Sequence, residues 1–216
     1  MLPSALAKIF FRFQKEREQM VYLMVGLGNP GSRYETTRHN IGFMALEALA
    51  AQLEIELKQK SFNSLWGKGT IAGTNILLAE PQTFMNLSGT AVRQLQSFFK
   101  TEISNLVVIH DDLDLPFGSI RLKAGGGTAG HKGLASIESN LGTSEFIRVR
   151  LGIGKPVDKS RIEGYVLEPF RKEEQIVLPD ILGWAADAST EIVLNGLQKA
   201  VSKYQTKNIN LLKKED

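Results

Sequence analysis

Short apolar runs alternate with segments of helical periodicity along most of the chain. Strand-like runs cover residues 22–25, 70–71, 76–78, 106–109 and 146–153. Helical patterns cover residues 41–53, about 88–100 and about 133–141, and a helical tail begins near Arg171, where Pro179 is expected to break the helix or to open a second one. This interleaving predicts an α/β fold in a single domain, with helices on both faces of a mixed central sheet.

The composition limits the chemistry that is available. Of the 216 residues, 43% are hydrophobic and 23% are charged, as in an ordinary globular protein. The sequence contains no cysteine, which excludes disulfides, cysteine-ligated zinc, iron–sulfur clusters and a cysteine nucleophile. The net charge of +3 is too small to indicate nucleic-acid binding by itself, and it does not oppose such binding.

No apolar stretch approaches the roughly 18 residues that a membrane-spanning helix requires. Residues 1–20 carry a weak apolar run followed by Lys15-Glu16-Arg17-Glu18, an order that does not fit a secretory signal. We therefore expect an N-terminal extension at residues 1–20, a folded domain at 21–205 and a C-terminal tail at 206–216. We also expect a cytoplasmic protein that does not contact membranes, which the absence of cysteine fits.

Two glycine-rich segments have the spacing of nucleotide-binding loops but lack the required context. Gly26 to Gly31 matches G-x-G-x-x-G after a strand, yet the helical pattern begins only about ten residues later, so no helix N-terminus is available for a pyrophosphate. Gly125 to Gly130 has phosphate-loop spacing, but His131-Lys132-Gly133 follows instead of Lys and Ser or Thr. We expect no nucleotide cofactor, and a loop that borders the functional site at the second segment.

The histidines lie at predicted strand ends or in loops, each within a polar or glycine-rich run. They are His39, His110 and His131. The carboxyl ends of strands, where active sites of α/β folds lie, include His110-Asp111. A histidine that takes a proton from water needs a carboxylate to fix its tautomer, and Asp111, Asp112 and Asp114 are candidates for that partner. One of these aspartates is also a candidate for an ordinary turn or helix cap.

Two side-chain amides complete the set of polar groups. Asn29 and Asn86 lie in loops with small neighbours, and an amide can bind a carbonyl in the ground state and an oxyanion in the transition state. An alternative interpretation of Asn86 is an N-cap of the following helix. Because no serine lies in a nucleophile elbow, these residues indicate hydrolysis of an acyl bond by activated water, without a cofactor. The alternative is metal-assisted hydrolysis, with the three histidines and the aspartates as ligands.

Several long motifs, taken together and in order, carry a resemblance to a known family. They are GLGNPGSRYETTRHNIGF, TFMNLSG, HDDLDLPFGSIRLKAGGGTAGHKGL, FIRVRLGIGKP and GYVLEPF. From about Val21 to Leu197 the chain resembles bacterial-type peptidyl-tRNA hydrolase. The resemblance implies a monomeric α/β enzyme that needs neither metal nor nucleotide. It also implies cleavage of the ester between a peptide and the terminal ribose of tRNA, which recycles tRNA from stalled translation.

The resemblance also implies roles for individual residues. His39 matches the general base, and Asp111 matches the carboxylate that orients it. Asn29 and Asn86 match positions that hold the peptide and stabilise the oxyanion.

Further positions of the family shape the groove and its borders. Tyr34 and Met85 match positions near the terminal nucleotide and the peptide, and His131 begins the segment that flanks the site. The chain departs from the family at one place, because Lys132 stands where an asparagine usually follows this histidine. We expect an active hydrolase in which Lys132 serves tRNA affinity more than peptide positioning.

The resemblance implies that the partner is the acceptor end of peptidyl-tRNA. Lys123 and Arg150 match a basic pair that grips tRNA phosphate, although each is also interpretable as a solvated surface charge. Some plastid relatives of this family act in RNA splicing rather than as enzymes, which leaves an RNA-binding role as the alternative. The presence of His39, Asp111 and the two asparagines together favours catalysis.

Overall fold

The computed structural model describes residues 20–205 and 207–209, apart from the side chain of Lys159. The predicted extension at residues 1–20 therefore lies outside the described residues except for Met20, and the predicted tail is described only at residues 207–209.

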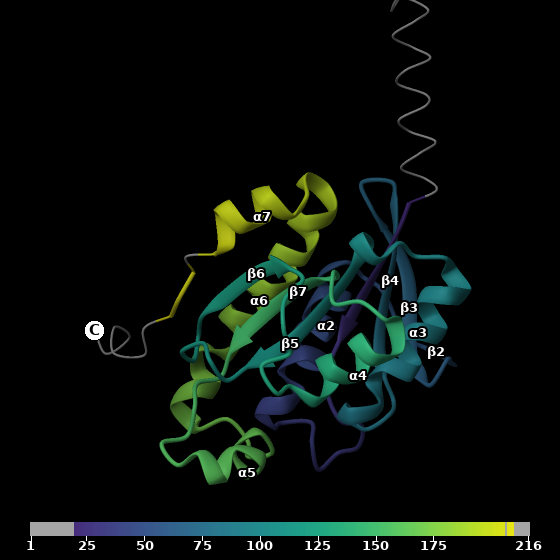
Figure 1. Ribbon diagram of the computed structural model, residues 1–216. Helices are drawn as coiled ribbons and strands as arrows, with labels where there is room; N and C mark the ends of the chain where they lie inside the picture. Colours follow the sequence, from purple (N-terminus) through teal and green to yellow (C-terminus); the bar gives the residue numbers. More distant parts are fainter. Residues whose placement is uncertain (1–19, 206, 210–216) are drawn as a thin grey trace, which may run out of the picture.

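Within the described residues, seven strands form one mixed sheet of order β2-β3-β4-β1-β5-β7-β6 (Figure 1). The strands are β1 (Val21–Gly26), β2 (Gln59–Ser61), β3 (Ser64–Ile71), β4 (Thr74–Pro81), β5 (Leu106–Asp112), β6 (Ile120–Ala124) and β7 (Ile147–Gly152). The four central strands β4, β1, β5 and β7 run parallel. Strands β2 and β3 extend one edge in the antiparallel sense, and β6 extends the other.

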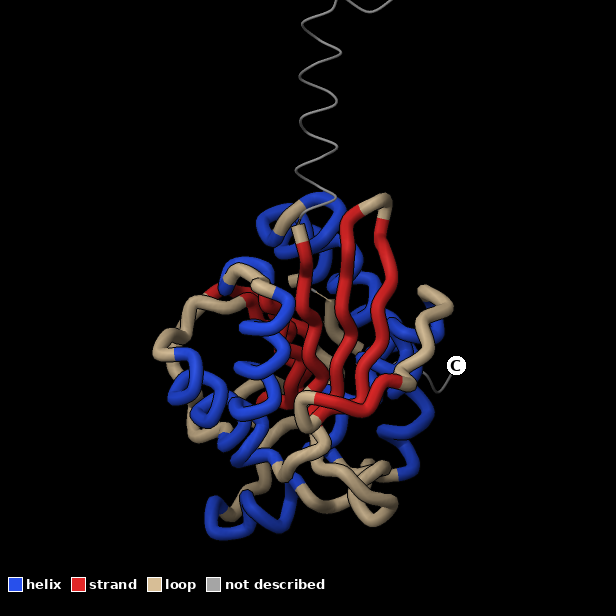
Figure 2. The backbone as a smooth tube through the Cα atoms, turned by 90° about the vertical axis from the view of Figure 1, so that its right-hand side faces the viewer, coloured by secondary structure: helices blue, strands red, loops and turns tan. Residues whose placement is uncertain are grey.

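Helices cover both faces of the sheet, as the sequence predicts (Figure 2). Helices α2 (Ile41–Gln52), α6 (Lys172–Asn195) and α7 (Leu197–Tyr204) pack on one face, and α3 (Ser88–Phe99) and α4 (Lys132–Leu141) pack on the other. The short helix α5 (Ile162–Val166) joins β7 to α6 and lies at the lower end of the molecule in Figure 1. None of the described helices is both long enough and apolar enough to cross a membrane.

Alternating side chains of the central strands feed two separate cores. In β1, Met24 faces the core under α2 and α6, whereas Leu23 and Val25 face the core under α3 and α4. In β5, Val107 and Val108 divide in the same way. This is why the parallel strands are continuous apolar runs rather than alternating ones.

Strand β1 and helix α2 approach closely, which shapes the site that follows. A Cβ atom at Gly26 would lie 2.4 Å from the carbonyl oxygen of Gly42, so glycine is needed there. The close approach brings the 3-10 helix η1 (Arg38–Asn40), which directly precedes α2, to the carboxyl end of β1.

Two local predictions are wrong. Helix α6 runs unbroken through Pro179, because its other backbone bonds and its buried face hold the helix together. Asn86 does not cap α3: Leu87 is the N-cap residue, Asn86 lies in the preceding 3-10 helix η2 (Met85–Leu87), and the Ser88 hydroxyl donates to the carbonyl of Met85.

Candidate active site

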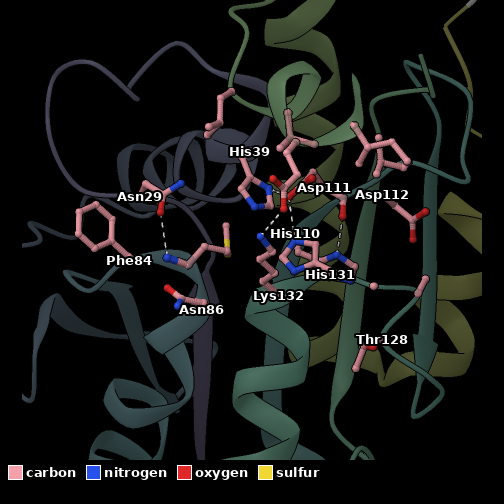
Figure 3. A pocket seen from close by; sticks show the side chains of 18 of the residues that line it. Asn29, His39, Phe84, Asn86, His110, Asp111, Asp112, Thr128, His131 and Lys132 are labelled. Carbon is pink, nitrogen blue, oxygen red and sulfur yellow. Dashed lines mark hydrogen bonds and ion pairs between the residues drawn. The ribbon is translucent and has the colours of Figure 1, made fainter. Parts of the chain in front are cut away.

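A cavity of about 500 Å³ opens at the carboxyl ends of the parallel strands (Figure 3). The end of β5 and the segments that follow β1 and β4 supply its polar groups, and the glycine-rich loop and α5 complete its walls. The cavity therefore lies where the sequence analysis places the site. The two glycine motifs border it: residues 26–31 lead from β1 into a loop rather than a helix, whereas residues 125–130 connect β6 to α4.

His39 and Asp111 form a direct hydrogen bond in this cavity. The His39 Nδ1 atom lies 2.9 Å from Oδ1 of Asp111, which is buried at the end of β5. Of the three candidate aspartates, Asp111 is thus the partner of His39. Asp112 accepts a bond from the Asp114 backbone N–H and is the turn cap, and Asp114 pairs with Lys155 at the surface.

His131 binds the same carboxylate oxygen from the opposite wall. Its Nε2 atom lies 2.9 Å from Oδ1 of Asp111. Its Nδ1 atom accepts the backbone N–H groups of Gly133 and Leu134 at 3.1 and 3.3 Å, so His131 is the N-cap of α4. Because Nδ1 accepts, the proton of this ring is on Nε2, and His131 donates to Asp111.

The tautomer of His39 follows from the ionised state of Asp111. Burial by itself would raise the pKa of Asp111, but the two histidines outweigh it and hold this pKa well below its ordinary value. The carboxylate therefore accepts from Nδ1–H of His39, and Nε2 of His39 keeps a free lone pair at the cavity.

The pKa of His39 shows the balance of the same forces. Burial lowers this pKa, and the charge and hydrogen bond of Asp111 raise it by more, so that it ends above 6.5. Lys132 acts in the opposite direction to Asp111. His39 is thus an oriented base whose protonated form is stabilised by a neighbouring charge.

His110 is adjacent, but it bonds to the backbone of Asp111 rather than to its carboxylate. Its Nδ1 donates to the backbone carbonyl of Asp111 at 2.7 Å, and its ring packs edge-on against His131. Burial lowers the pKa of His110 to about 3, so it stays neutral.

The donor set of this cluster fits hydrogen bonding better than metal binding. His39, Asp111 and His131 bring ligand atoms within 4.8 Å of one another, which is close enough for an ion. However, Nε2 of His131 carries a proton, and moving it to Nδ1 would face it against two backbone N–H groups of α4. A metal would have to break the helix cap to gain this ligand.

Asn29 is fixed so that its amide group faces the site. Its Oδ1 atom accepts the backbone N–H of Met85 at 2.9 Å, and this leaves Nδ2 as a free donor. Asn40 holds the backbone of Asn29 through two bonds of 2.9 Å, one to N–H and one to the carbonyl. In Figure 3 Asn29, Phe84 and Asn86 lie on one side of the histidines.

The remaining predicted residues form the walls. Asn86 is exposed, and Tyr34 packs edge-on against the exposed ring of Phe84. Met85 is buried, and a Cβ atom at Gly133 would lie 2.5 Å from its sulfur, so the glycine is needed for this contact. The outer wall is α5, whose first turn joins α4 through the exposed ion pair of Lys132 with Glu163, 2.7 Å long.

Lys123 and Arg150 lie on the neighbouring strands β6 and β7. Arg150 donates from Nε to Asp112 at 2.7 Å, and among the described residues no hydrogen bond occupies its two Nη groups. Burial lowers the pKa of Lys123, and the positive charges of Arg150 and Arg148 lower it further. Such a group of cations favours an anion beside it.

Two positioning residues were missed by the sequence analysis. Arg38 is buried, pairs with Glu174 at 2.8 Å and donates to the carbonyl of Pro169, which fixes η1 against the start of α6. Asn40 is the other. Both flank His39 in a polar run. Only their burial in the structure distinguishes them from surface residues.

An α/β sheet that gathers an imidazole–carboxylate pair and a fixed amide at the ends of its parallel strands has the groups that a hydrolase requires. Comparison with known proteins narrows this class. The sequence profile of the family described as peptidyl-tRNA hydrolase matches residues 23–211. The chain belongs to the peptidyl-tRNA hydrolase family, which confirms the resemblance.

Individual relatives agree over most of the chain. The peptidyl-tRNA hydrolase of Geotalea uraniireducens is 47% identical over 189 residues, which cover 88% of this chain and 98% of that protein. The peptidyl-tRNA hydrolase of Bacillus subtilis is 50% identical over 152 residues, which cover 70% and 81%. A crystal structure of peptidyl-tRNA hydrolase from Acinetobacter baumannii matches with a TM-score of 0.83 and 36% identity, covering 88% of this chain and 97% of that one.

Proposed function

We propose that this protein hydrolyses the ester bond between tRNA and a peptide or N-blocked amino acid, and that water activated by His39 is the nucleophile. The observation that carries the proposal is the bond between His39 Nδ1 and Asp111, which leaves Nε2 of His39 free at a cavity that also holds the Asn29 amide. The family supports the substrate. The geometry supports the mechanism.

The reaction needs one base and one set of donors. Nε2 of His39 takes a proton from water as the water oxygen bonds to the ester carbonyl carbon. The carbonyl oxygen becomes an oxyanion, which Nδ2 of Asn29 and the exposed amide of Asn86 stabilise. When the tetrahedral intermediate collapses, the ester C–O bond breaks, and the ribose oxygen takes the proton from His39.

The surrounding residues hold the two ends of the substrate. Tyr34, Phe84 and Met85 offer an apolar surface to the peptide and the terminal nucleotide. Lys123 and Arg150 bind tRNA phosphate near the acceptor end, where a guanidinium can form two parallel bonds. No metal and no partner subunit are needed, because one chain supplies all of these groups. We infer that the protein acts as a monomer in the cytoplasm.

Turnover of N-acetyl-aminoacyl-tRNA by the purified protein tests this proposal. His39→Ala should reduce kcat by about 10²- to 10⁴-fold, the usual effect of removing a general base, while tRNA binding persists. Chelator should leave wild-type turnover unchanged. Loss of turnover in chelator with recovery in zinc would overturn the mechanism, and a folded wild-type protein that binds tRNA without cleaving it would favour the RNA-binding role.

A further inference from the structure

Arg148 is a buried cation whose hydrogen bonds, among the described residues, all go to backbone carbonyls, and its guanidinium also lies over the ring of Phe146, 4.7 Å from the ring centre. It lies on β7 and is 1% exposed. Its Nη groups donate to the carbonyls of Gly126, Gly127 and Ser144, the second at 2.7 Å and the third at 3.3 Å. Among the described residues, no carboxylate pairs with it. Because a buried charge is unfavourable without good partners, these carbonyls must be held firmly around the guanidinium.

The three carbonyls lie on both connections of helix α4. Gly126 and Gly127 belong to the glycine-rich loop before the helix, and Ser144 belongs to the turn after it. In this loop Gly125, Gly126 and Gly130 have positive φ, a backbone conformation that favours glycine. Arg148 therefore ties both ends of α4 to the sheet.

The loop held by Arg148 ends at His131, and His131 connects it to the Asp111–His39 pair. His131 caps α4 with Nδ1 and donates to Asp111 from Nε2, and Asp111 orients His39. A shift of the loop or of the start of α4 would move the His131 ring and with it the shared oxygen of Asp111.

The same anchor lies beside the cations of β6 and β7. Lys123 on β6 is the register partner of Arg148 on β7. The Nζ atom of Lys123 lies so close to Gly126 that a Cβ atom at position 126 would clash with the lysine. A phosphate bound by Lys123 would thus lie next to the loop that Arg148 holds. Arg148 is too deeply buried, and its Nη groups too fully used, to bind that phosphate itself.

We propose that Arg148 is a positioning residue that fixes the glycine-rich loop and α4. In this position His131 holds Asp111 against His39 while Lys123 and Arg150 bind the tRNA phosphate beside the loop. The proposal rests on the proposed function for its kinetic readout. It does not make Arg148 a contact of tRNA.

Arg148→Lys is the direct test, with Arg121→Lys as the matched control. Lysine keeps the charge but cannot reach both connections of α4. Arg121 lies on β6, on the same face of the sheet, but it donates to the carbonyls of Ile120 and Gln205, away from the loop. Arg148→Lys should reduce kcat about tenfold, the effect of removing one hydrogen bond, and change KM by less than about threefold. Arg121→Lys should leave both unchanged.

A double-mutant cycle with His131→Ala asks whether Arg148 acts through His131. If it does, Arg148→Lys should have little further effect on kcat in the His131→Ala background. The proposal would be overturned if the double mutant lost kcat by the product of the two single-mutant factors. It would also be overturned if Arg148→Lys raised KM and left kcat unchanged. An unchanged kcat in folded Arg148→Lys protein would overturn it as well.

A measurement on the wild-type protein tests the anchor even if Arg148→Lys does not fold or the enzyme assay fails. The Nη–H protons of Arg148 should give separate, slowly exchanging NMR signals, because carbonyls hold them away from water. Averaged, rapidly exchanging signals would mean that the loop is not anchored in this way. Slow signals in a protein without turnover would leave the anchor standing and defeat the proposed function alone.

Discussion

The Nδ1 atom of His39 lies 2.9 Å from Oδ1 of Asp111, and this bond places the proton of the neutral imidazole away from the cavity. His131 donates to the same oxygen, so the carboxylate is held from two sides. Oδ1 accepts both bonds, and an asparagine at position 111 also carries an oxygen that can accept them. Asp111→Asn can therefore keep the positions of both histidine rings and remove only the negative charge.

Asp111→Asn should therefore act mainly on the pKa of His39. His39 works as a base only when neutral, so kcat/KM should fall as the pH drops through its pKa, which lies above 6.5. Without the negative charge the protonated form is less stable, and the acid limb should move to lower pH. The loss in kcat should be smaller than for His39→Ala. Asp112→Asn is the control, and an acid limb that shifts there but not in Asp111→Asn would refute this interpretation.

Asn29→Asp separates the role of the Asn29 Oδ1 acceptor from that of the Nδ2 donor. The aspartate keeps an oxygen for the backbone N–H of Met85 but replaces the Nδ2 donor, so kcat should fall about 10²- to 10³-fold, as when one oxyanion donor is removed. Steady-state kinetics at saturating substrate measure the effect. A mutant with normal kcat would mean that Asn29 only supports the loop.

The substrate should require a blocked amino group. A peptide offers an uncharged amide and a carbonyl, whereas free aminoacyl-tRNA offers an ammonium and leaves the buried Asn29 amide unpaired, which costs about 1–3 kcal/mol. The ratio of kcat/KM for N-acetyl-aminoacyl-tRNA over aminoacyl-tRNA measures this preference. Similar values for the two substrates would argue against it.

Lys123 and Arg150 should govern tRNA affinity. Replacing either by alanine should raise KM more than it lowers kcat, and should reduce the slope of log(kcat/KM) against log salt by about 0.7–0.9 for each phosphate that is no longer bound. Lys123→Ala should have the simpler effect, since Arg150 is also bound to Asp112. A salt slope that is unchanged in the double mutant would exclude these residues as the phosphate site.

The ion pair of Lys132 with Glu163 should be a weak competitor of tRNA. Both side chains are exposed, and Glu163→Gln should free Lys132, lower KM and steepen the salt dependence. Lys132→Asn should keep kcat within about tenfold of wild type. In the Lys132→Asn background, Glu163→Gln should have no effect, and a KM decrease there would show that Glu163 acts on tRNA directly.

The sequence predicts the parts of the fold that carry strong patterns. The buried runs at β1 and β5 and the amphipathic helices α3 and α4 are all where expected. Strand β2 and helix α5 were missed, because three exposed residues or five helical ones make no readable period. The hairpin turn is only Ala72-Gly73, both with positive φ, so β3 and β4 are longer than expected.

The candidate site divides in the same way. His39, Asp111 and Asn29 are recognisable in the sequence because each lies at a predicted strand end or in a loop, within a polar or glycine-rich run. The partner among the three aspartates, the cap made by His131 and the Lys132–Glu163 pair depend on contacts between distant segments. Asn40 and Arg38 act through buried polar contacts, and the burial of a polar side chain cannot be predicted from its residue type.

The nitrogen NMR spectrum of the histidine rings, followed through a pH titration, tests the central claim most directly. The chain has 3 histidines, so each signal can be assigned. At neutral to alkaline pH, His39 and His110 should carry the proton on Nδ1 and His131 on Nε2, and the pKa of His39 should equal that of the acid limb of kcat/KM. A neutral His39 that carries its proton on Nε2, or a His39 pKa unrelated to that limb, would contradict its role as the base.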